Sequence, residues 1–127
     1  MSEEQKQRIL IVEDEKPMAR ALELKFSDSG FEAKAVHDGQ QALDALDSEA
    51  FDVILLDLIM PVMDGFAVLE QLQQKGNTVP VLVSTNLSQP EDAERAKALG
   101  ASDYFVKSDT PIAEVVRHVE QALGRHS

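Results

Sequence analysis

A regular alternation along the chain is the feature that most constrains its fold. Five short apolar, strand-like runs lie at residues 8–12, 31–36, 52–57, 79–85 and 103–107. Five segments with apolar residues at helical spacing follow them, at residues 16–30, 38–50, 64–76, 88–100 and 110–124. Helices between consecutive strands make the strands parallel, with right-handed crossovers. The sequence therefore predicts an α/β domain built from five strand–helix units.

The polarity of each run predicts its place in the sheet. The second run, FEAKAV, alternates, with Phe31, Ala33 and Ala35 on one face, which is typical of an edge strand with one wet face. The first, third and fourth runs are continuously apolar and belong in the centre. We therefore expect a doubly wound, flavodoxin-like parallel sheet with strand order 2-1-3-4-5. In this order ligands bind at the carboxyl ends of the strands, at the switch point between strands one and three.

Local signals mark the helix ends. Pro17 lies near the start of the first helix and Gly30 near its end, and Asp38 is an expected N-cap of the second. Ser88 and Glu91 have capping-box spacing, which predicts that the fourth helix begins at Ser88. In the last helix the apolar side is formed by Ile112, Val115, Val116, Val119 and Leu123.

Size and composition indicate one domain. The chain has 127 residues, and we expect a core at about residues 7–124 with frayed ends at 1–6 and 125–127. There is no cysteine, which excludes disulfides and cysteine-based zinc sites. The polar N-terminus does not resemble a signal peptide, and no apolar run approaches the ~20 residues of a membrane helix. A cytoplasmic location is the expectation.

The charge balance is strongly acidic. Lysine and arginine number 12 and aspartate and glutamate 23, a formal net charge of −11. Direct nucleic-acid binding needs a basic surface and is not expected. A site for a divalent cation is compatible with this charge.

One carboxylate, Asp57, lies in the most apolar stretch, FDVILLDLIMPVMDG. A lone ionised carboxylate in apolar surroundings costs many kcal/mol, so we expect Asp57 at the carboxyl end of its strand, in polar company. The carboxyl ends of the other strands carry Glu13, Asp14, Ser84, Thr85 and Lys107. Three carboxylates, a hydroxyl and an ammonium are therefore predicted to meet at one edge of the sheet.

That combination suits phosphoryl chemistry. Three close carboxylates repel one another, and Mg2+ relieves the repulsion because it prefers carboxylate, water and phosphate oxygens. Lys107 supplies a positive charge and Thr85 a hydroxyl donor for phosphoryl oxygens. Asp57 is then a nucleophile of the aspartyl-phosphate type.

Four segments carry a family resemblance: LIVEDE (10–15), DLIMPVMDG (57–65), PVLVST (80–85) and GASDYFVK (100–107). In this order and spacing they resemble the response-regulator receiver domain of two-component signalling, including single-domain chemotaxis regulators. The resemblance covers essentially the whole chain.

The resemblance implies roles for the acidic residues. Asp57 would accept the phosphoryl group from a sensor histidine kinase or phosphotransfer protein. Asp14 would bind Mg2+ directly, Glu13 would hold it through water, and Ile59 would offer its backbone carbonyl. The protein would assist its own phosphorylation and dephosphorylation without being an enzyme for external substrates.

The resemblance also implies a switch. Thr85 would bond the new phosphoryl oxygen, with Ser84 as the competing choice, and Lys107 would pair with the phosphoryl group or with free Asp57. Tyr104 would swing inward, changing the face made by helix four, strand five and helix five. That face would bind a downstream protein target or a second copy of the chain.

Two residues depart from the family pattern. Ser108 replaces the usual proline after Lys107, which predicts a trans peptide bond or a strained loop there. Asn86 replaces a small residue after the switch hydroxyl, where it would narrow the approach to Asp57 or bond a phosphoryl oxygen.

Three other functions are possible for a chain with this topology. A flavodoxin-like cofactor binder needs a Gly/Ser/Thr-rich phosphate loop where this chain has EDEKP, and an aspartyl-phosphate hydrolase needs an acid where it has Ile59. The remaining alternative is an interaction scaffold that works without phosphorylation. His37, His118 and His126 have no metal-ligand spacing and are predicted to be ordinary surface residues.

Overall fold

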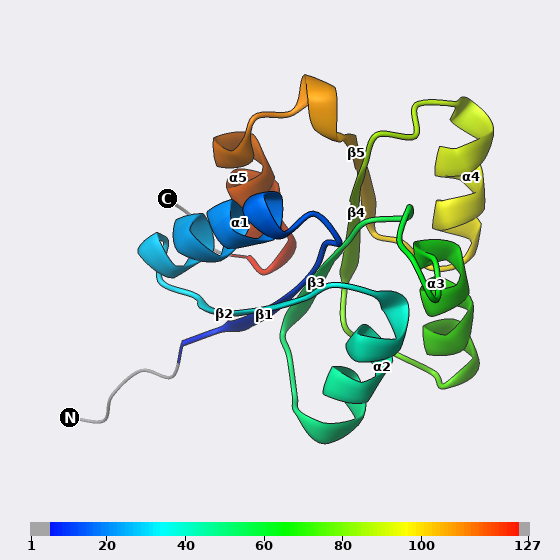
Figure 1. The fold of residues 1–127 in the computed structure, drawn as a ribbon, viewed down its shortest axis with the longest axis horizontal. Coiled ribbons are helices and arrows are strands. Elements are labelled where there is room, and N and C mark those ends of the chain that lie inside the picture. Colours follow the sequence, from blue (N-terminus) through cyan, green and yellow to red (C-terminus); the bar gives the residue numbers. More distant parts are fainter. Residues whose placement is uncertain (1–5, 125–127) are drawn as a thin grey trace.

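The expected sheet and strand order are confirmed. The computed structural model describes residues 6–124, which form one five-stranded parallel sheet with the order β2-β1-β3-β4-β5 (Figure 1). The elements are β1 (Arg8–Val12), α1 (Lys16–Asp28), β2 (Glu32–Val36), α2 (Gly39–Ser48), β3 (Val53–Leu56), α3 (Gly65–Gln74), β4 (Val81–Thr85), α4 (Pro90–Ala98), β5 (Asp103–Val106), the 3-10 turn η1 (Lys107–Asp109) and α5 (Ile112–Ala122). Of the ends predicted to fray, 1–6 and 125–127, all but residue 6 lie outside the described residues.

Helices cover both faces of the sheet, which gives two apolar cores. Helices α1 and α5 pack on one face, and α2, α3 and α4 pack on the other (Figure 1). Strand β3 serves both cores, since Val53 and Leu55 point to the first and Ile54 and Leu56 to the second. A strand covered on both sides has no wet face, which explains why its sequence is continuously apolar. Among residues 6–124, no helix is long and apolar enough to cross a membrane.

The helix-end predictions hold with one exception. Asp38 caps α2, since its side chain accepts the N–H of Gln41. The expected capping box at Ser88 is wrong: α4 begins at Pro90, with Gln89 as the N-cap and no side-chain cap bond. Proline is favoured in the first helical turn, because it has no N–H to satisfy there. Its position therefore moves the start of the helix past Ser88.

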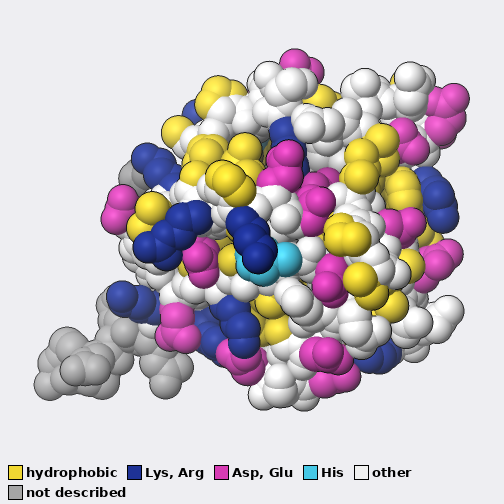
Figure 2. All heavy atoms as spheres, viewed as in Figure 1, with side chains coloured by type: hydrophobic (Ala, Val, Ile, Leu, Met, Phe, Trp, Pro, Cys, Tyr) yellow, Lys and Arg dark blue, Asp and Glu magenta, His cyan; other side chains and the backbone are white. Residues whose placement is uncertain are grey.

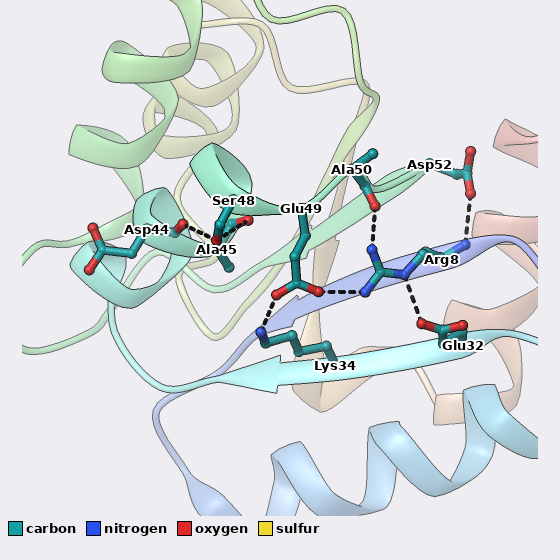
Figure 3. Close-up of polar contacts among 9 residues, drawn as sticks. All are labelled: Arg8, Glu32, Lys34, Asp44, Ala45, Ser48, Glu49, Ala50 and Asp52. Carbon is teal, nitrogen blue, oxygen red and sulfur yellow. Dashed lines mark hydrogen bonds and ion pairs between the residues drawn. The ribbon is translucent and has the colours of Figure 1, made fainter.

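An ion-pair network closes the amino-terminal end of the sheet (Figure 3). The Arg8 guanidinium on β1 contacts the carboxylate of Glu32 on β2 at 2.9 Å and that of Glu49 at 2.6 Å. It also donates to the carbonyl of Ala50 at 2.8 Å, and Lys34 pairs with Glu49 from β2. The network ties the end of α2 to β1 and β2.

The ion-pair network predicts how the stability of the fold depends on pH. Lys34 and Arg8 lower the pKa of Glu49 below its ordinary value of 4.5. A lowered pKa stabilises the fold above the unfolded pKa, and this stabilisation is lost as the pH falls through the folded pKa. Glu49→Gln should therefore lower the melting temperature at pH 7, and the difference from the unmodified protein should shrink below pH ~4.5.

Thermal unfolding followed by circular dichroism between pH 3 and 7 measures this difference. Glu94→Gln, on the exposed side of α4, is the control and should show little effect at any pH. An equal deficit for Glu49→Gln at pH 3 and pH 7 would contradict the ionic explanation.

Candidate functional site

The carboxyl ends of two strands bring the predicted acidic residues together. Glu13 and Asp14 directly follow β1, and Asp57 directly follows β3. The Asp57 N–H donates to the carbonyl of Val12 at 3.0 Å, so the parallel ladder extends one residue past β3. One carboxylate oxygen of each acid lies within 4.8 Å of the others. The predicted convergence of Glu13, Asp14 and Asp57 is observed.

Lys107 joins two of these acids. Its ammonium, at the end of β5, lies 2.5 Å from Oε1 of Glu13 and 2.9 Å from Oδ2 of Asp57. Both acids are nearly buried, at 2% and 5% exposure. Backbone N–H groups complete the set: Ile59 donates to Oδ1 of Asp57 at 3.2 Å, and Glu15 to Oε2 of Glu13 at 3.1 Å. Buried carboxylates are stable only with such partners.

Burial and pairing act on the charges in opposite directions. Burial raises the pKa of Glu13, and the bonds from Lys107 and the Glu15 N–H offset part of that rise. Burial works to lower the pKa of Lys107, but its bonds to Glu13 and Asp57 outweigh burial and raise it above 10.5. Lys107 is therefore charged at neutral pH.

The site is open to solvent despite the burial of Asp57. A pocket of about 150 Å³ is lined by Asp14, Glu15, Asp57, Ile59, Asn86 and Lys107. Five of these six side chains carry polar groups, and Ile59, which is 52% exposed, forms an apolar part of the rim. A small anion thus has a route to the Asp57 carboxylate.

The loop after Asp57 is tightly built. The Gly65 N–H donates to the carbonyl of Leu58 at 2.9 Å, and a Cβ on Gly65 would lie 2.4 Å from the carbonyl oxygen of Asp57. Only glycine fits here, so α3 begins directly against the backbone of the site. Between them, Val62 has φ +69° and is 81% exposed, an unusual conformation for a β-branched residue.

Thr85 and Tyr104 meet at a residue that sequence analysis missed. Thr85 is fully buried and its hydroxyl accepts the N–H of Leu87 at 3.4 Å, whereas Ser84 is 8% exposed. The Tyr104 hydroxyl donates to the carbonyl of the same Leu87 at 2.7 Å. Both backbone groups of Leu87 are thus held by the two predicted switch residues. No sequence signal marks Leu87, because it contributes only its backbone.

The two departures from the family pattern have structural outcomes. Ser108 lies in η1, and no cis peptide bond occurs among residues 6–124, which confirms the trans alternative. Asn86 lines the pocket, as expected for a residue that narrows the approach to Asp57.

Two of the three histidines have specific contacts. His118 lies 3.5 Å from a carboxylate oxygen of Asp103. His37 contacts the backbone of Glu13, so it belongs to the surroundings of the site. His126 lies outside the described residues.

Comparison with known proteins agrees with this site. Strand order and acidic cluster together define a doubly wound domain with a polar site at its switch point. The family model of the response regulator receiver domain matches residues 9–119, and the chain belongs to this family, whose members serve two-component signalling.

Individual relatives are of two kinds. The chain is 36% identical to the probable transcriptional regulator ycf27 of Porphyridium aerugineum, over 97% of this chain and 53% of that protein. It is 34% identical to the transcriptional regulatory protein PcoR of Escherichia coli, over 94% and 52%. The chain thus spans about half the length of these relatives. The solved receiver domain of the Francisella response regulator 1452 superposes with a TM-score of 0.88 at 27% identity, covering 93% of this chain and 97% of that one.

The acidic cluster predicts a stabilising substitution. Among the described residues, no hydrogen bond or ion pair is made by the half-buried Asp14 side chain, which faces two other carboxylates. Asp14→Asn removes repulsion, so the free energy of unfolding in metal-free buffer should rise by about 1 kcal/mol. Urea unfolding measures this free energy, and Glu70→Gln on the exposed side of α3 is the control, with no gain expected. A loss of stability for Asp14→Asn would show that repulsion is not the dominant effect.

The backbone conformation of Val62 predicts a second stabilising substitution. A side chain in the left-handed region costs about 1–2 kcal/mol unless the residue is Gly, Asn or Asp. Val62→Asn should therefore raise the free energy of unfolding by about 1 kcal/mol, as measured in urea. Val62→Thr keeps the branched Cβ and should give no gain. Equal effects of the two substitutions would mean that backbone strain at this position is not the cause.

Proposed function

We propose that the domain is a phosphoacceptor switch in which Asp57 takes a phosphoryl group from a histidine kinase or phosphotransfer protein. The observation that supports this most is the setting of Asp57. Its carboxylate is 2.9 Å from the Lys107 ammonium and borders a pocket of about 150 Å³. A nucleophile, a cation for phosphoryl oxygens and a route for the donor thus occur together.

The acidic residues suit a magnesium ion. Glu13, Asp14 and Asp57 offer hard carboxylate oxygens at mutual distances within 4.8 Å, and Ile59, which lines the same pocket, would offer its backbone carbonyl. Asp14 and Asp57 would bind directly, and Glu13, already paired with Lys107, would act through water. When bound, the ion would neutralise charge on the phosphoryl oxygens.

The transfer follows from the positions of the side chains. An Asp57 carboxylate oxygen forms a bond to phosphorus as the bond from phosphorus to the donor histidine nitrogen breaks, and the electron pair remains on that nitrogen. Lys107 neutralises charge on the transferred group from its position beside Asp57. The Ile59 N–H, now bonded to Asp57, is the nearest backbone donor. Asn86, on the pocket wall, offers an amide to a phosphoryl oxygen.

Thr85 and Tyr104 would convert this event into a change of surface. If the Thr85 hydroxyl moves toward a phosphoryl oxygen to donate its proton, its oxygen leaves the long, 3.4 Å bond from the Leu87 N–H. Leu87 is then free to move, and with it the carbonyl that holds the Tyr104 hydroxyl. Tyr104 turns inward and the face of α4, β5 and α5 changes, which is a two-state switch. A downstream protein or a second copy of the chain binds there.

A protein partner is preferred over nucleic acid for this domain. The net charge is −11, and on the face in Figure 2 acidic side chains interrupt the basic ones instead of leaving a continuous basic surface. The relatives named as transcriptional regulators are about twice as long as this chain.

Phosphorylation by a small donor tests the proposal. Incubation with Mg2+ and acetyl phosphate should add one phosphoryl group, detected by intact mass. Asp57→Asn should abolish the adduct, because the nucleophile is lost. Asp52→Asn, at the opposite end of the same strand, is the matched control and should keep it. No adduct on the unmodified protein would instead favour the phosphorylation-independent scaffold.

A further inference from the structure

We propose that His37 is a positioning residue for Asp14, and so for the magnesium site that the proposed function requires. Its ring lies beside the first acidic loop, where Nδ1 is 3.1 Å from the carbonyl oxygen of Glu13. His37 directly follows edge strand β2, so it reaches the site from a strand that contributes no acid of its own.

The chemistry of the contact fixes its direction. A carbonyl oxygen only accepts hydrogen bonds, so Nδ1 must carry the proton and donate it. The Glu13 N–H in turn donates to the carbonyl of Val36 at 3.0 Å. Both backbone polar groups of Glu13 are therefore held by the end of β2.

Holding this carbonyl also places Asp14. The carbonyl of Glu13 and the Cα of Asp14 belong to one planar peptide unit, so the bond to His37 helps to fix the position of the Cα from which the Asp14 side chain leaves the backbone. Glu13 and Asp57 are fixed through their side chains by Lys107. Among residues 6–124 no comparable bond or ion pair holds the Asp14 carboxylate, so its placement depends on the backbone.

His37 is itself mounted on a rigid turn. Its N–H donates to Oε1 of Gln41 at 2.8 Å, and the Gln41 N–H donates to Asp38 at 2.8 Å. The next residue, Gly39, packs so closely that a Cβ would lie 2.4 Å from the carbonyl oxygen of Met63, in the loop after Asp57. His37 in the turn and Gly39 at the start of α2 thus contact the two loops that carry the acids, so the backbone that bears His37 is held between them.

Three substitutions of His37 distinguish the effect of its hydrogen bond from the effect of its ring. His37→Phe keeps a ring and removes the donor. His37→Asn places an amide N–H near the position of Nδ1, and His37→Gln places one near Nε2, away from the carbonyl. His118→Phe, at the other half-exposed described histidine, is the control.

The main measurement is Mg2+ affinity by isothermal titration calorimetry, without any phosphodonor. His37→Phe and His37→Gln should weaken binding about tenfold, which is typical for residues that orient metal ligands. His37→Asn and His118→Phe should stay within about twofold of the unmodified protein. If His37→Phe is unfolded by circular dichroism, His37→Gln supplies the same comparison with His37→Asn.

The second measurement is the Mg2+ dependence of phosphorylation by acetyl phosphate. The half-saturating Mg2+ concentration should rise about tenfold in His37→Phe, and the rate at saturating Mg2+ should change less than twofold. A purely structural role would lower stability in all three His37 variants, without raising the half-saturating Mg2+ concentration more than it lowers the rate at saturating Mg2+.

The results that overturn the proposal are specific. Unchanged Mg2+ affinity in His37→Phe, or equal losses in His37→Phe and His37→Asn, would show that the bond to Glu13 does not position Asp14. Failure of the proposed function looks different: the unmodified protein binds Mg2+ and forms no phosphoryl adduct.

Discussion

The Lys107 ammonium between Glu13 and Asp57 is the interaction on which the site depends. It joins the carboxyl ends of β1, β3 and β5, and it makes two nearly buried carboxylates tolerable. One ammonium does not balance three carboxylates, however, and the remaining negative charge falls on the side where Asp14 borders the pocket. The same arrangement that holds the loops together therefore leaves room for a cation.

The two ends of the sheet are built for different purposes. At the amino-terminal end, Arg8 and Lys34 pair with the acids around them, and the network holds the end of α2 against β1 and β2. At the carboxyl-terminal end, Asp14, which has no partner among residues 6–124, and the exposed Ile59 border one pocket, and Val62 with its positive φ lies in the loop that follows Asp57. Features that cost stability gather where chemistry is proposed, as is common at functional sites. Stability is supplied elsewhere in the fold.

Several site residues were predictable because strand order turns sequence position into spatial position. Asp57, Glu13 and Lys107 each follow an apolar run, so parallel pairing had to bring them to one edge. His37 and Leu87 were not predictable on these grounds, since they act through bonds to or from backbone groups. Such contacts depend on the path of a loop, which the residue types do not specify. The helix starts were predictable only in part. The sequence correctly indicated the N-cap at Asp38, but it wrongly placed the start of the fourth helix at Ser88.

The sequence by itself determined the strand order, the two-sided core and the set of residues at the carboxyl edge, because hydrophobic periodicity and parallel crossovers permit few alternatives. Only the tertiary structure decided how those residues are paired. It pairs Lys107 with Glu13 as well as with Asp57, leaves Asp14 facing the pocket, and brings His37 to the loop that carries Glu13 and Asp14. The physical reason is that pairing depends on ångström-scale distances between side chains, which are set by packing across the whole sheet.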